Sequence, residues 1–152
     1  LNVLELAHKA CIELGIKDPA IAVSGLNPHS SEGGLFGHEE TEEIIPAVKE
    51  AQRLGFNVTG PLPPDSVFSK ALNGMYDIVV AMYHDQGHIP IKFHHSQEPG
   101  GVNITLGLPI IRVSVDHGTA FDIAWKNTAS PESLKEAIRY ASLYANNRKR
   151  GI

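Results

Sequence analysis

The 152 residues suffice for one globular domain, and their formal net charge of −4 removes any electrostatic case for nucleic-acid binding. No apolar run approaches the roughly 20 residues that a membrane-spanning helix needs. The single cysteine, Cys11, excludes an intramolecular disulfide framework, and its place in an apolar helical stripe favours a buried structural thiol over a nucleophile.

The first part of the chain alternates helical and strand patterns. Residues 3–14 carry apolar side chains at helical spacing, and Gly15 suits the left-handed end of a helix. Because Leu1 already lies in this helical pattern, and no secretory signal is visible, we expect further sequence upstream. The apolar run 21–23 predicts a short buried strand. Residues 38–54 predict a second helix, with glutamates in its first turns as the helix dipole favours.

The second part continues the alternation. Its predicted strands are 58–60, 78–82, 104–106 and 110–115. A short helix capped by Asp65 or Ser66 is expected to end at Leu72, and a last helix to span 132–147 with Ser130 as its cap. Strands that alternate with helices indicate an α/β fold, so we expect a single α/β region over the whole chain.

Two histidines directly follow predicted strands. They are His29, in the motif Asn27-Pro28-His29 of the long glycine-rich loop 24–37, and His84, in the motif Tyr83–Gly87. In open α/β sheets, ligands and catalytic groups gather at the carboxyl ends of the strands, and two imidazoles there are able to hold a divalent metal. The alternative is two unrelated polar loop residues. The adjacent His94 and His95 are interpreted as loop residues.

A second candidate site is the loop 118–124, which follows the predicted strand 110–115. Its glycine permits close backbone approach to a ligand, and Asp122 offers acceptors to ribose hydroxyls or adenine. The loop lacks the GxGxxG pattern of dinucleotide sites. A tight turn after a strand is therefore the alternative interpretation.

A third set combines Lys92, Asn103 and Arg112. Arg112 interrupts an apolar strand, and burying a guanidinium is costly unless the charge is paired. A phosphate or carboxylate ligand would satisfy it with two parallel hydrogen bonds. A salt bridge to Asp116 or Asp122 is the structural alternative, which the residues by themselves favour.

Five longer motifs occur in the order found in one known family. They are Gly25–His29, Glu32–Gly34, Ala81–Gly87, Gly101–Pro109 and Ser114–Ala120. Together they resemble the C-terminal half of the 4-hydroxythreonine-4-phosphate dehydrogenases of vitamin B6 biosynthesis, from about Ala20 onward. The stretch 117–124 also resembles the adenosine-binding loop of isopropylmalate and isocitrate dehydrogenases. The resemblance implies the C-terminal part of an isocitrate/isopropylmalate dehydrogenase-like α/β fold, with the N-terminal half absent from this chain.

The resemblance also implies an activity: oxidation and decarboxylation of 4-phosphohydroxy-L-threonine by NAD, in the cytoplasm, for pyridoxal phosphate synthesis. It implies a divalent metal (Zn, Mg, Co or Mn) held by three histidines. His29 and His84 match two of them, and the third is expected upstream of Leu1. The enzymes of this family are homodimers that share metal ligands across the interface. No membrane or nucleic-acid partner is expected.

The family's other site residues transfer to this chain by position. Asp65 and Asp85 match acidic positions near the site, where they would handle protons or support other groups. Substrate contacts fall on Lys92, Asn103 and Arg112, which favours an anion over a salt bridge as the partner of the arginine. Cofactor contacts fall on His117, Gly118, Thr119, Ala120, Asp122 and Ile123.

Three departures from the family bear on the substrate. Ser30-Ser31 stands where many members have Ala-Gly, Trp125–Asn127 stands where related dehydrogenases usually have glycine, and the segment 94–100 is slightly longer. A sister group acts on four-carbon sugar-acid phosphates, so 4-phospho-D-threonate and 4-phospho-D-erythronate are alternative substrates. A catalytically incomplete fragment that only binds cofactor or a partner is the second alternative.

Overall fold

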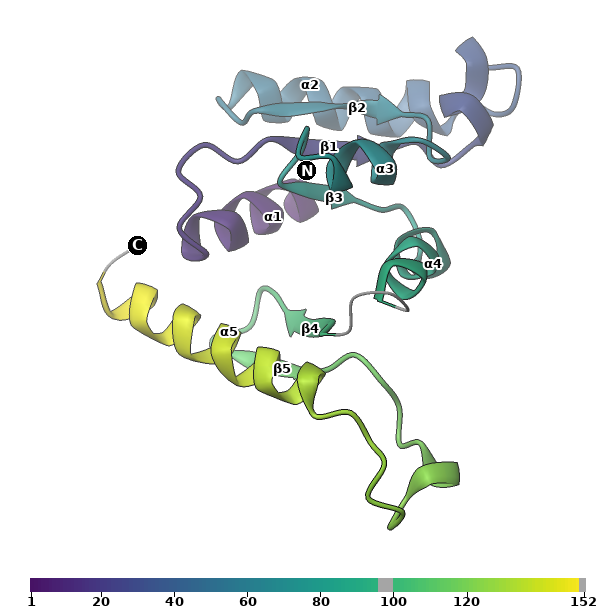
Figure 1. The fold of residues 1–152 in the computed structure, drawn as a ribbon. Helices are drawn as coiled ribbons and strands as arrows, with labels where there is room; N and C mark the ends of the chain where they lie inside the picture. The colour runs from purple at the N-terminus through teal and green to yellow at the C-terminus, as the bar shows by residue number, and fades with distance from the viewer. Residues whose placement is uncertain (96–99, 151–152) are drawn as a thin grey trace. The chain divides into compact units, whose positions relative to one another are not determined.

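The computed structural model describes residues 1–95 and 100–150, and the chain forms two compact units, Leu1–Pro90 and Ile91–Ile152 (Figure 1). The lengthened segment 94–100 thus falls largely outside the described residues. None of the described helices combines the length and the apolar character that crossing a bilayer requires.

The first unit is built on a three-stranded parallel sheet in the order β2-β1-β3. These strands span Val58–Leu62, Ile21–Ser24 and Ile78–Val80, respectively. β1 is central, and all four of its residues are buried. Parallel strands joined through helices confirm the predicted α/β class.

Three helices of this unit accompany the sheet: α1 (Asn2–Glu13), α2 (Ile45–Arg53) and α3 (Val67–Leu72). The core joins buried side chains of α1 and α2 to those of the strands: Leu4, Ala7, Ile21, Val23, Val48, Ala51, Val58 and Val80. The predicted helix 38–54 begins instead as a π-helical turn, η2 (Glu40–Ile44), and continues as α2. Pro46 lacks the N–H that an α-helical hydrogen bond to Glu42 would need, which accounts for the change of geometry.

The helix α4 (His84–His95) follows β3, begins in the first unit and ends in the second. Gly87 and Pro90 inside it weaken the helical pattern of the sequence, and this helix was not predicted. The interpretation of His94 and His95 as loop residues was therefore wrong, because both lie in its last turn.

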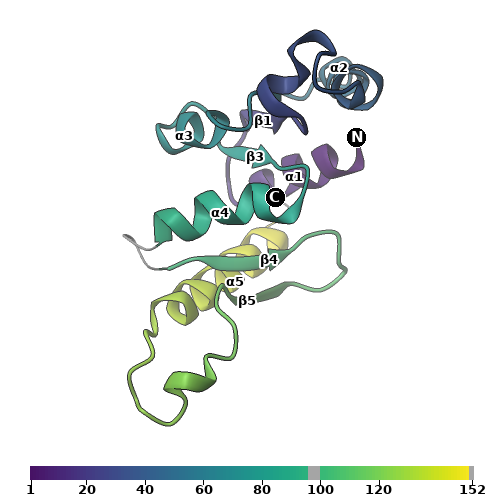
Figure 2. The same ribbon diagram turned by 90° about the vertical axis from the view of Figure 1, so that its right-hand side faces the viewer.

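The second unit contains an antiparallel pair, β4 (Val102–Thr105) and β5 (Arg112–Val115), with the long helix α5 (Glu132–Lys149) packed along it (Figure 2). A short turn of 3₁₀ helix, η3 (Phe121–Ile123), lies between β5 and α5. β5 starts at Arg112 rather than at Ile110, whose side chain is exposed.

Candidate functional site

The candidate metal histidines follow neighbouring strands. His29 lies in the turn η1 (Pro28–Gly33) after β1, and His84 opens α4 after β3. Since β1 and β3 pair in parallel, both chain segments leave the same edge of the sheet. The buried Gln86 links them: its Nε2 donates to Gly25 O over 2.8 Å, and its Oε1 accepts from Met82 N over 2.7 Å.

Four consecutive residues of η1 adopt left-handed backbone conformations. His29, Ser30, Ser31 and Glu32 have φ angles of 52°, 55°, 65° and 48°. Such conformations cost roughly 1–2 kcal/mol for each residue with a Cβ, and strained backbone of this kind concentrates at functional sites. The Ser30-Ser31 departure lies within this turn, and Ser30 Oγ is buried with no hydrogen-bond partner in the described part of the chain.

The His29 ring has two neighbours from its own loop. Its Nδ1 lies 3.2 Å from Glu32 Oε1, and Phe36 meets the ring edge-on with centroids 6.3 Å apart. The side chains of His29 and Glu32 are 61% and 52% exposed, so the pair adds little to folding stability.

The loop that carries His29 is anchored to the buried side chain of Glu40. Glu40 Oε1 accepts from Asn27 N over 2.7 Å, and Oε2 accepts from Asn27 Nδ2 over 2.9 Å. Asn27 Nδ2 also donates to Glu39 Oε2 over 2.7 Å. A Cβ at Gly37 would lie 2.6 Å from Asn27 Nδ2, so the returning chain needs glycine there. Burial raises the pKa of Glu40, but the hydrogen bonds from Asn27 outweigh it and the net pKa is lowered.

We expect Glu40→Gln to destabilise the protein by about 1–3 kcal/mol, because an amide donor then faces one of the two Asn27 donors. The matched control, Glu42→Gln, changes an exposed glutamate of the same helix and should shift stability by no more than about 0.5 kcal/mol. Urea unfolding of both variants measures the difference.

The same anchor predicts the pH dependence of stability. A lowered carboxyl pKa in the folded state stabilises the protein above the unfolded glutamate pKa of about 4.3, and this stability is lost as pH falls through the lowered pKa. Glu40→Gln should remove that part of the acid sensitivity. Equal stability of Glu40→Gln and Glu42→Gln at pH 7 would contradict the stabilising role proposed for the contact between Glu40 and Asn27.

His84 has a similar setting. Its Nδ1 lies 2.7 Å from Asp85 Oδ1, and its ring stacks on that of His88, with centroids 4.1 Å apart and planes at 11°. The sequence analysis missed both Glu32 and His88. The spacing of four residues between His84 and His88 becomes a signal only once α4 is recognised as a helix.

The two histidines fit the chemistry of a divalent metal site. In each, a carboxylate contacts Nδ1 and leaves Nε2 as the nitrogen available to a metal, the arrangement usual for metal-binding imidazoles. Residues 1–95 and 100–150 contain no group of three or more potential ligands close enough to hold an ion. Asp65 is exposed in the turn between β2 and α3.

In the second unit, two basic side chains, Lys92 and His95, contact Asp116. Lys92 Nζ lies 3.1 Å from Asp116 Oδ2 and donates to Asp116 O over 2.6 Å, while His95 Nδ1 lies 3.4 Å from the same carboxylate oxygen. Partial burial raises the pKa of Asp116. The hydrogen bonds and charge interactions with Lys92 and His95 together lower it by more, so the net pKa falls below its usual value.

The premise that Arg112 is buried was wrong. Its side chain is exposed, and Nη1 donates to Thr105 Oγ1 over 2.8 Å. A pattern of apolar residues cannot tell which face of a two-stranded hairpin a helix will cover. Thr105 pairs with Arg112, and Asn103 with Ser114, so Asn103 and Arg112 share one face of the hairpin. Asp116 is paired with Lys92 and His95 rather than with Arg112.

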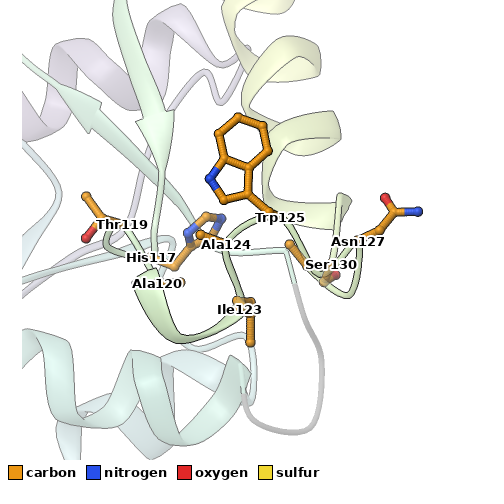
Figure 3. A pocket seen from close by; sticks show the side chains of 9 residues that line it. His117, Thr119, Ala120, Ile123, Ala124, Trp125, Asn127 and Ser130 are labelled. Carbon is orange, nitrogen blue, oxygen red and sulfur yellow. The ribbon is translucent and has the colours of Figure 1, made fainter.

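The loop after β5 lines an open cavity of about 590 Å³ (Figure 3). Four of the predicted cofactor residues line it: His117, Thr119, Ala120 and Ile123. Trp125 is fully exposed and also lines this cavity. Gly118 and Asp122 belong to the same loop but lie outside the lining.

Comparison with known proteins shows which family the chain resembles. The chain is 59% identical over 133 residues to the 4-hydroxythreonine-4-phosphate dehydrogenase of Desulforapulum autotrophicum, covering 88% of this chain and 38% of that protein. It is 53% identical over 140 residues to the D-threonate 4-phosphate dehydrogenase of Salmonella typhimurium, covering 92% and 42%.

A solved structure, that of 4-hydroxythreonine-4-phosphate dehydrogenase from Klebsiella pneumoniae, superposes with a TM-score of 0.80 at 52% identity. It is matched over 94% of this chain and 43% of that chain, so the chain spans about two fifths of the length of such relatives. The model of the family described as pyridoxal phosphate biosynthetic protein PdxA matches residues 1–141, and the chain therefore belongs to the PdxA family.

Proposed function

We propose that this chain is the C-terminal part of an NAD-dependent, divalent-metal-dependent dehydrogenase of 4-phosphohydroxy-L-threonine in pyridoxal phosphate biosynthesis. The observation that supports it most is the pair of strand-end histidines, His29 and His84, each with a carboxylate at Nδ1, in a chain of the PdxA family. The complete enzyme would be a cytoplasmic homodimer with a shared active site.

In this proposal His29 and His84 supply two imidazole ligands, and a third histidine comes from outside the 152 residues. A zinc or other divalent ion held by these histidines would supply Lewis acidity to the substrate C3 oxygen. Asp65 and Asp85 either accept the proton that leaves the C3 hydroxyl of the substrate or hold other side chains of the site in position. The short contact of Asp85 with His84 Nδ1 favours the supporting role for Asp85.

The remaining residues bind and orient. Arg112 and Asn103, on one face of the hairpin, together with Lys92, hold the phosphate of the substrate. The loop 117–123 holds the adenosine end of NAD in the cavity beside Trp125. NAD bound there would supply the hydride acceptor for oxidation at C3, and the β-keto acid that this oxidation would give would lose carbon dioxide.

D-threonate 4-phosphate is the second candidate substrate. The relatives divide between the two activities at similar identity, with 57% to a putative D-threonate 4-phosphate dehydrogenase of Oceanobacillus iheyensis. 4-Phospho-D-erythronate is a third candidate of the same chemical class. Assays of the full-length protein with all three phosphorylated acids, side by side, decide among them; activity with none would overturn the proposed function. The 152 residues alone are expected to be inactive, as a fragment that binds only cofactor or partner.

The cofactor assignment predicts a preference for NAD over NADP. A carboxylate near a ribose accepts from its hydroxyls and repels a 2′-phosphate, and Asp122 is the residue we assign to this role. Steady-state kinetics of the full-length enzyme with both cofactors measure the preference, and Asp122→Asn should reduce it. An equal or higher kcat/KM with NADP would refute the assignment.

A further inference from the structure

We propose that Glu32 is a positioning residue for the metal ligand His29. Its carboxylate would accept a hydrogen bond from the Nδ1–H of the imidazole and so present Nε2 to the metal. The inference rests on the proposed metal site and adds to it a residue for which the sequence analysis had no role.

The evidence begins with the backbone. The left-handed turn from His29 to Glu32 returns the chain so that the carboxylate lies beside the ring, with Glu32 Oε1 3.2 Å from His29 Nδ1. Phe36 closes a second side of the ring through its edge-on contact. Two contacts from one loop therefore define the direction in which Nε2 points.

Exposure argues against a structural role for the pair. Both side chains are more than half exposed, and ion pairs of this kind contribute little to folding. Four consecutive left-handed residues nevertheless bring the side chains of His29 and Glu32 together, at a cost in backbone strain. This combination fits a contact that serves the ring rather than the fold.

The chemistry of metal-bound histidine explains what the contact does. A carboxylate on Nδ1–H fixes the tautomer with Nε2 unprotonated and makes that nitrogen a better donor. His84 has the same arrangement with Asp85. Two histidines from different motifs at one sheet edge thus share one form of support.

The test measures metal affinity in the full-length protein. Glu32→Ala should weaken Zn²⁺ binding, measured by competition with a chelator, about 10–100-fold. Glu32→Gln, whose amide oxygen still accepts from Nδ1–H, should recover part of the loss. The control Glu42→Gln, at an exposed glutamate of η2, should bind as the wild type does. Thermal unfolding of the metal-free variants should be unchanged.

Two further measurements separate the possible failures. The Co²⁺ absorption spectrum should keep its band positions in Glu32→Gln; a changed coordination sphere would mean that Glu32 is itself a ligand, which overturns the positioning role. If His29→Ala abolishes Zn²⁺ binding while Glu32→Ala stays within twofold of wild type, the positioning role fails and the metal site stands. If His29→Ala binds normally, the proposed metal site fails, and this inference with it.

Discussion

Replacing either His29 or His84 by alanine should strip most of the bound metal, and with it most of the activity, from the full-length protein. Each change would remove one donor nitrogen from the proposed three-histidine site. The loss should therefore exceed the roughly 10–100-fold effect expected for a supporting carboxylate. Because both side chains are largely exposed, the metal-free fold should be unaffected.

Elemental analysis of the purified variants measures the metal content directly. His38→Ala is the matched control, an exposed histidine of the same unit to which we assign no role. It should retain both metal and activity. A wild-type metal content in either His29→Ala or His84→Ala would refute the histidine assignment, whatever the activity.

The full-length enzyme should also prefer phosphorylated acids over their dephosphorylated forms by orders of magnitude. Hydrogen bonds to charged groups contribute about 1.5–3 kcal/mol each, and an uncharged hydroxyl would make none of the charged contacts proposed for a phosphate with Lys92 and Arg112. A control substrate without phosphate that reaches a comparable kcat/KM would exclude an anion site.

Arg112 should contribute more to this preference than Lys92, because Lys92 already pairs with Asp116. Arg112→Lys keeps the charge but loses the planar fork of donors. The substrate KM should rise, while NAD binding and thermal stability stay unchanged, as the exposure of this side chain implies. A loss of stability with normal kinetics would show that the arginine is structural.

The parts of the site that follow strands could be predicted from the sequence. The apolar runs before His29 and His84 are short, β-branched and bounded by polar loops, and both are neighbouring parallel strands in the structure. The helix that His84 begins could not be predicted, since Gly87 and Pro90 both oppose helical geometry locally. The surrounding tertiary structure outweighs the low helix propensity of these two residues, and the segment is helical.

The burial and the contact partners of the residues around the site could not be predicted from local sequence patterns. Glu40 was visible only as one of several glutamates in the first turns of a helix, yet it is the buried one. Its partner Asn27 lies 13 residues earlier, so the pair depends on how the whole loop turns back. The exposure of Arg112 likewise depends on the face of the hairpin against which α5 packs.

The hydrogen bonds from Asn27 to Glu39 and Glu40 determine how long a segment must be if the histidine loop is to be moved into another protein. Loop 25–37 contains the histidine motif and its left-handed turn, but the carboxylates that hold Asn27 belong to residues 39 and 40. A graft of 25–37 into another α/β scaffold would leave the backbone N–H of Asn27 and its amide without acceptors. Extending the graft to residue 40 would move the loop together with its own tether.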